Sequence, residues 1–236
     1  MRLSPDEIVL WQYGPVTLNA TIVFTWLIMG GLVSASWLAT RRMTGDVHLT
    51  RWQNLLEALV SVMRDQIRDI SRQEPGRYLP FIGSLFLFIV VSNLLIIVPG
   101  YEPPTGSLST TAALAICVLL SVPFYGITSS GFWRYCKHYI EPSFIMLPFH
   151  ILGEFTRTIS LAVRLYGNIM SGSVIVAILL SIAPLFFPII MQMLGFLVGL
   201  IQAYIFAILA MVYIASAATA HAEKEHAGQQ PGKGER

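Results

Sequence analysis

The stretch EFTRTISLAVRLYGNIMSGS, Glu154–Ser173, places charged side chains where the surrounding sequence is apolar. The chain from Phe149 to Ile182 otherwise carries mostly apolar or small residues, and it exceeds the roughly 20 residues that a helix needs to cross a bilayer. Arg164 is therefore expected near the middle of a membrane, where an arginine costs about 2.5 to 3.5 kcal/mol to insert. A residue that costs this much needs a partner, a water-filled cavity or a function.

The polar residues of this stretch recur at steps of three and four, so a helix would carry them on one face. That face comprises Glu154, Arg157, Leu161, Arg164, Asn168 and Ser171. In the simplest alternative, the arginines only pair with Glu154 or with carbonyl groups inside a bundle, or extend to the membrane surface. We expect a function for Arg164, and for Arg157 both interpretations stay open.

The composition indicates an all-α, polytopic membrane protein. Of its 236 residues 55% are hydrophobic and 12% are charged, which is too apolar for a soluble domain of this size. The net charge of +2 implies no general attraction to nucleic acid. Cys117 and Cys136 are expected at different depths and without metal-ligand neighbours, so no disulfide, metal or other cofactor is predicted.

We expect a single membrane domain, 1–236, with about five transmembrane helices. The predicted spans are 18–39, 79–98, 108–128, 149–182 and 189–218, and the long arginine-bearing helix should pack against the last one. The pattern over 51–72 predicts an amphipathic cytoplasmic helix, and 221–236 is expected to form a mobile cytoplasmic tail. The distribution of Lys and Arg predicts an N-terminus outside the cell and a cytoplasmic C-terminus.

Two further features concern helix contacts. Asn93 is the one strongly polar residue of the second span, and we interpret it as an interhelical hydrogen-bonding residue rather than a site. In the last span a stripe of small residues at spacing four predicts close approach of another helix, and Gln202 lies beside that stripe. The stripe consists of Gly195, Gly199, Ala203 and Ala207.

Two motifs resemble subunit a of the F-type ATP synthase. They are SLAVRLYGNIMSG (Ser160–Gly172) and IQAYIF (Ile201–Phe206). The first departs from the family's most specific signature only by having Val163 at its first position. Weaker similarity in SNLLIIVPG (Ser92–Gly100) and PPTGSLSTTAALA (Pro103–Ala115) extends the resemblance over nearly the whole chain except the first span.

The resemblance implies a stator without a catalytic site, which lies against a ring of c subunits and offers two offset half-channels for ions. The family's essential arginine maps onto Arg164, its asparagine onto Asn168 and its final-helix glutamine onto Gln202. The guanidinium would favour the charged form of a ring carboxylate and would block a direct leak between the half-channels. Peripheral-stalk b subunits, a soluble catalytic head and a bacterial inner membrane are the further implied surroundings.

Several positions depart from the family pattern. Ser173 stands where many members have an acid, Gly195 where some have a histidine, and Ser107 where an aspartate is often found. Glu102 is then the only acid near the external access path. Protons remain the expected coupling ion, with sodium as the alternative. Supporting channel residues would be Glu154, Arg157, Ser171, Ser173, Glu102 and Asn93.

Two other classes of function compete with this interpretation. A stand-alone secondary transporter with its substrate site at Arg164 would transport without any ring subunit. A membrane-embedded hydrolase is disfavoured, because the histidines fall in loops or near span ends rather than at membrane depth. They are His48, His138, His150, His221 and His226.

Overall fold

The computed structural model describes residues 9–13, 16–41, 51–71, 75–98, 101–131, 146–182 and 187–219. Within these ranges five helices are long and apolar enough to cross a membrane, and one further α-helix accompanies them. The predicted all-α, polytopic fold is therefore confirmed. The predicted tail, 221–236, lies outside the described residues.

The α-helices are α1 (Ala20–Arg41), α2 (Arg51–Ser71), α3 (Leu79–Leu94), α4 (Leu108–Ser130), α6 (Met146–Ile182) and α7 (Phe187–Thr219). The 3-10 turns are η2 (Pro75–Arg77), η3 (Leu95–Ile97) and η4 (Pro104–Gly106). An antiparallel hairpin of β1 (Val9–Tyr13) and β2 (Val16–Asn19) precedes α1. The sequence analysis did not predict this hairpin, although its strands VLWQY and VTLN are rich in β-branched and aromatic residues.

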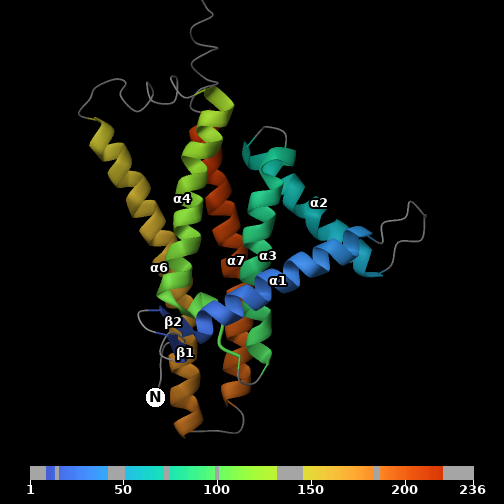
Figure 1. Cartoon of the computed structure of the whole chain (residues 1–236), viewed down its shortest axis with the longest axis vertical. Helices are drawn as coiled ribbons and strands as arrows, with labels where there is room; N and C mark the ends of the chain where they lie inside the picture. Colours follow the sequence, from blue (N-terminus) through green and yellow to red (C-terminus); the bar gives the residue numbers. More distant parts are fainter. Residues whose placement is uncertain are drawn as a thin grey trace, which may run out of the picture.

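Helices α3, α4, α6 and α7 form the central bundle, and α1 and α2 lie against its side (Figure 1). The predicted packing of α6 against α7 is present, and α4 contacts both of them. The core of the bundle consists of apolar side chains with almost no exposed surface, among them Ile89, Val118, Leu165, Phe206 and Ile214. Large apolar residues on the outer faces stay exposed, as expected for helices that meet lipid rather than water.

Helix α2 has the amphipathic character that its sequence predicts. Ile67 is buried against the bundle, and Met63 and Ile70 pack against the core beside it. Arg64 and Arg68 are exposed. One apolar face thus covers α3 and α7, and the charged face points away from them.

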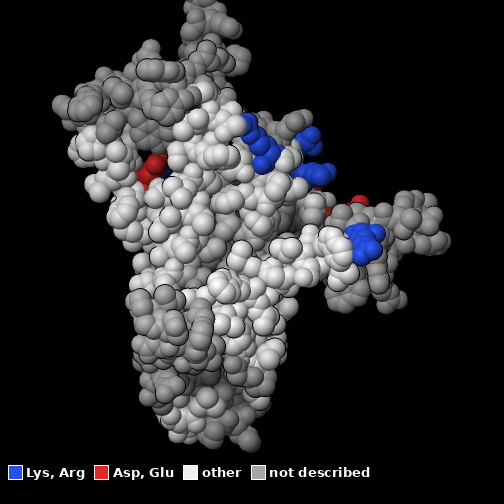
Figure 2. Space-filling view, viewed as in Figure 1, with Lys and Arg blue, Asp and Glu red and all other residues white. Residues whose placement is uncertain are grey.

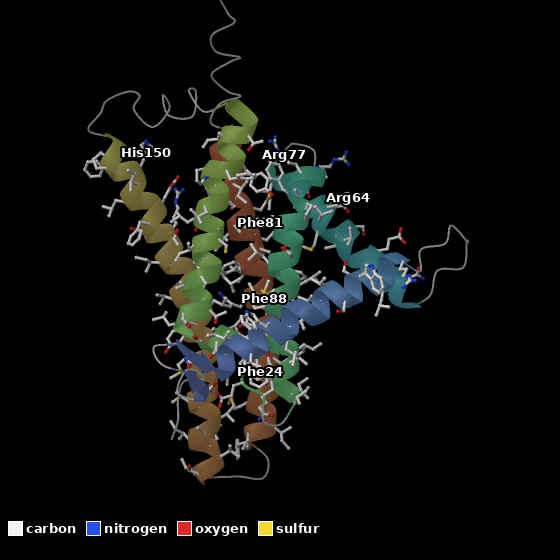
Figure 3. The ribbon with its side chains drawn as sticks, viewed as in Figure 1. Phe24, Arg64, Arg77, Phe81, Phe88 and His150 are labelled. Atoms are coloured by element: carbon white, nitrogen blue, oxygen red, sulfur yellow. The ribbon has the colours of Figure 1, made fainter. Side chains whose placement is uncertain are left out.

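The arginines of α2 and η2 mark one end of the bundle. Arg64 and Arg77 lie near the first turn of α3, and the start of α6 at His150 lies at the same end (Figure 3). In Figure 2 the blue atoms gather in the upper half of the molecule, over α2 and the adjoining ends of α1 and α3. We call this end the basic end.

The part of the connection between α3 and α4 that directly precedes α4, residues 103–107, is buried, although a connection between two spans would ordinarily lie on the surface. Thr105 and Ser107 in this segment have no exposed surface. The Thr105 hydroxyl donates to Asn93 Oδ1 at 3.1 Å, and Asn93 Nδ2 donates to the carbonyl of Gly199 at 2.9 Å. The expected interhelical role of Asn93 is therefore confirmed, because it joins α3, α7 and the buried segment.

The small-residue stripe of α7 serves this contact. A Cβ added at Gly199 would lie 3.0 Å from Asn93 Nδ2 and 3.2 Å from its Cγ. At Gly199 it is thus α3 that approaches α7 closely. A larger residue here would displace the side chain that fastens the buried segment.

Replacing Asn93 should destabilise the bundle. Asn93→Ala removes two hydrogen bonds and leaves a small cavity, for which we expect a loss of about 1 to 3 kcal/mol in the free energy of unfolding. Thermal unfolding of the full chain in detergent measures it. Ser84→Ala is the control, because the exposed Ser84 hydroxyl only bonds the Phe81 carbonyl of its own helix. An unfolding midpoint of Asn93→Ala equal to that of the control would contradict this role.

Candidate functional site

Helix α6 presents two different faces. Leu161, Leu165 and Ile169 are buried in the bundle. Arg157, Arg164 and Ser171 are exposed, and their seven-residue spacing places them two turns apart along one edge of the helix. The prediction that Leu161 belongs to the polar face is therefore wrong, because its apolar side chain packs inward in the bundle.

Arg164 lies on the outer surface of the bundle. Its side chain is exposed, and it makes no ion pair with any residue that the structure describes. Val163 beside it is 53% exposed, so the guanidinium shares the outer face with exposed apolar surface as well as with the exposed Ser160 and Ser171. Such a face meets either lipid or another chain in the membrane.

Arg157 has a partner within the chain. Its guanidinium carbon lies 5.4 Å from the centroid of the Tyr213 ring on α7, which is a cation–π contact. Both residues line a cavity of about 20 Å³ between α4, α6 and α7, together with polar side chains of Glu154, Thr158 and Ser216. That volume is sufficient for about one water molecule. The structure thus brings the predicted Glu154 and Arg157 together.

The contact between Arg157 and Tyr213 fixes how the two antiparallel helices align. The helices run in opposite directions, so a residue a given number of positions after Arg157 in α6 lies level with the residue the same number of positions before Tyr213 in α7. Each position corresponds to about 1.5 Å along the helix axis. Arg164 then lies level with Phe206, and Asn168 lies level with Gln202. The helices therefore bring the three predicted translocation residues to neighbouring levels.

Gln202 is buried, with 7% of its surface exposed, and its Nε2 has no hydrogen-bond partner among the described residues. A buried amide nitrogen without a partner costs about 1 to 3 kcal/mol. Among the described residues, neither Gln202 nor Asn168 makes a hydrogen bond to Arg164. Asn168, one turn further along α6, and Gln202, on the facing helix, are expected to hold the guanidinium in place, and this role stays a prediction.

A larger cavity of about 480 Å³ opens toward the end opposite the basic end. Asn168 and Ser173 of α6 line it, as does Glu102 of the segment after α3. Gln192 and Gly195 of α7 line it from the other side. Three residues predicted from separate parts of the sequence thus meet in one cavity, which begins one turn from Arg164.

The two remaining supporting residues line neither cavity. Ser171 is exposed, and its hydroxyl bonds the Asn168 carbonyl of its own helix at 3.1 Å. Asn93 belongs to the scaffold described above. Among the described residues, no cluster of three or more His, Cys, Asp or Glu is arranged as metal ligands.

Sequence reasoning missed Gln192 and Tyr213. Gln192 precedes Gly195 by one helical turn within an apolar span, and a polar residue at that depth is itself a signal of function. Tyr213 follows Phe206 by two turns, but an aromatic residue near a span end also fits a membrane-interface belt. Only the packing of α6 on α7 distinguishes these possibilities.

The cation–π contact predicts a difference between two substitutions of Tyr213. Tyr213→Leu should lower the free energy of unfolding by about 0.5 to 1 kcal/mol more than Tyr213→Phe, because phenylalanine keeps the ring that attracts Arg157. Thermal unfolding of the full chain measures both. Equal destabilisation by the two variants would show that the ring does not hold Arg157.

Known proteins resemble this chain over nearly its whole length. The family model described as ATP synthase A chain matches residues 22–215. ATP synthase subunit a 2 of Acaryochloris marina is 58% identical over 92% of this chain and 93% of the relative. ATP synthase subunit a of Albidiferax ferrireducens is 54% identical over 98% and 100%, and that of Nitrosospira multiformis is 52% identical over 98% and 92%. With its five apolar helices, the chain belongs to the ATP synthase subunit a family, the multi-pass membrane stator subunits of the F-type ATP synthase.

Proposed function

We propose that this subunit passes ions to and from a ring of c subunits, with Arg164 as the central residue. The observation that carries the proposal is the exposed Arg164, which has no ion-pair partner among the described residues of its own chain. An unpaired guanidinium on a lipid-facing surface is costly, so its counter-charge has to come from a neighbouring subunit. A membrane carboxylate on a ring subunit meets this requirement.

The chemistry at this contact follows from charge. A ring carboxyl that carries its ion is neutral and can face lipid, whereas next to Arg164 its ionised form is favoured. The carboxyl therefore releases its ion as it approaches the arginine. Because a guanidinium does not deprotonate in proteins, Arg164 itself passes no proton and separates the two sides.

The two cavities lie on opposite sides of Arg164 along α6, which is where two half-channels would run. The larger one approaches Arg164 from the end opposite the basic end and reaches Asn168. The smaller one lies two turns from Arg164 toward the basic end, beside Arg157. Ions would enter by one cavity, travel with the ring, and leave by the other. Asn168 and Gln202 lie at the level where the larger cavity approaches the arginine.

Protons are the proposed coupling ion, and sodium is the second candidate. Glu102 is the only acid among the residues that line the larger cavity, and the other polar groups there are hydroxyl and amide groups. A water-filled path can conduct protons without further titratable groups. Oxygen ligands without a protonatable relay also suit a sodium ion, which is why sodium stays in consideration.

The surroundings follow from the same proposal. The basic end with Arg64 and Arg77 would be cytoplasmic, with the N-terminus outside a bacterial inner membrane. Peripheral-stalk b subunits and the catalytic head would be the further partners, and this subunit would itself catalyse no reaction. A stand-alone transporter is less well supported, because Arg164 lines neither of the two cavities described above.

The proposal predicts that Arg164→Ala abolishes ATP-driven ion uptake. Membrane vesicles that contain the assembled complex provide the measurement, and co-purification with the other subunits shows that the variant assembles. Arg68→Ala is the matched control, because it removes an exposed arginine from α2, and it should keep most of the uptake. Uptake by an assembled Arg164→Ala complex at the control rate would refute the proposal.

A further inference from the structure

The larger cavity contains one formal charge. Its wall comes from four segments: η3 with the following Val98, the segment 101–106, α6 and α7. Most of the lining residues are apolar or small, including Ile96, Val176 and Leu180. Glu102 is the only charged residue among them. A single carboxylate between apolar walls dominates the electrostatic potential of the cavity.

The segment that carries Glu102 is fixed in place. On one side of it, the Tyr101 hydroxyl donates to the Ser92 carbonyl at 3.2 Å, and the Tyr101 ring meets Phe24 edge-on at 5.0 Å between centroids. On the other side, Pro103 is buried and Thr105 bonds Asn93 at 3.1 Å. Glu102 itself is half-buried. The backbone at Glu102 is therefore held beside the cavity by the residues on both sides of it, and Glu102 itself lines the cavity.

Tyr101 does not contribute a second acid. Burial raises the pKa of its hydroxyl, and the bond to Ser92 does not offset this. The phenol therefore stays neutral at any pH at which a cell works. Negative charge in the cavity comes from Glu102 alone among the described lining residues.

The opposite wall supplies uncharged oxygen atoms. Ser173 of α6 and Gln192 of α7 both line the cavity, and Asn168 lies toward Arg164. Carboxylate, hydroxyl and amide oxygens are the groups that bind hydrated or partly dehydrated monovalent cations. Near a fixed carboxylate the local concentration of such cations exceeds that of the bulk solution by about tenfold or more.

We propose that Glu102 is the cation-collecting group of this cavity, and that Ser173 and Gln192 face the collected ion. The ligand is a monovalent cation, either hydronium or sodium. The proposal rests on the proposed function and deepens it, because it assigns the entry step to one carboxylate outside the membrane-spanning helices. Glu102 affects the ion concentration at which the cavity fills, whereas Arg164 determines whether ions are transferred at all.

The test measures ATP synthesis by the complete complex in proteoliposomes as the ion concentration on the cavity side is varied. One arm varies pH without sodium, and the other varies sodium at fixed pH. The arm in which the unaltered complex saturates identifies the ion. In that arm Glu102→Gln should raise the half-saturating ion concentration by about tenfold with little change in the maximal rate. Glu57→Gln, which removes an exposed acid from α2, should leave it unchanged.

A second pair of variants adds a carboxylate from the opposite wall. Ser173→Glu should lower the half-saturating concentration of the otherwise unaltered complex, and it should restore entry when combined with Glu102→Gln. An unshifted half-saturating concentration in Glu102→Gln, or failure of Ser173→Glu to restore it, would overturn the proposal. If these variants still synthesise ATP at the normal maximal rate, the proposed function stands even when the role of Glu102 is refuted. Failure of the Glu102 proposal is thus distinguishable from failure of the proposed function.

Discussion

The cost of a guanidinium on a lipid-facing surface is the constraint on which this structure depends. Arg164 is exposed on α6 while the apolar residues on the other side of that helix fill the bundle. Nothing among the described residues of the chain neutralises the charge. Since an uncompensated charge at that depth is expensive, we proposed that a carboxylate of another subunit supplies the counter-charge. In that proposal the Arg164 face is one half of a contact between subunits.

Two contacts position the rest of the site around that arginine. The cation–π contact of Arg157 with Tyr213 aligns α6 with α7, and the hydrogen bond from Asn93 to the Gly199 carbonyl aligns α7 with α3. The same Asn93 fastens Thr105, and so the segment that carries Glu102. A change at either contact would move a cavity relative to Arg164. The positions of the residues proposed for the ion path therefore depend on the scaffold residues.

The sequence predicted the helices well, because long apolar runs and their polar interruptions are local signals. It also singled out Arg164, which the structure leaves exposed, and Asn168 and Glu102, which line the larger cavity, but their roles in ion transfer stay predictions. It failed at Leu161, since spacing alone does not show which side of α6 packs inward. It missed Gln192 and the burial of Thr105, because both depend on contacts between segments far apart in the chain.

Site-specific photo-crosslinking in the assembled complex tests the central claim most directly, namely that the Arg164 face of α6 meets the ring. A photoreactive residue at Val163, which is 53% exposed beside Arg164, is compared with one at Phe124, which is 65% exposed on α4. The account predicts an adduct with a ring subunit from position 163 and none from position 124. Capture of the ring from position 124, with only lipid captured from 163, would contradict it.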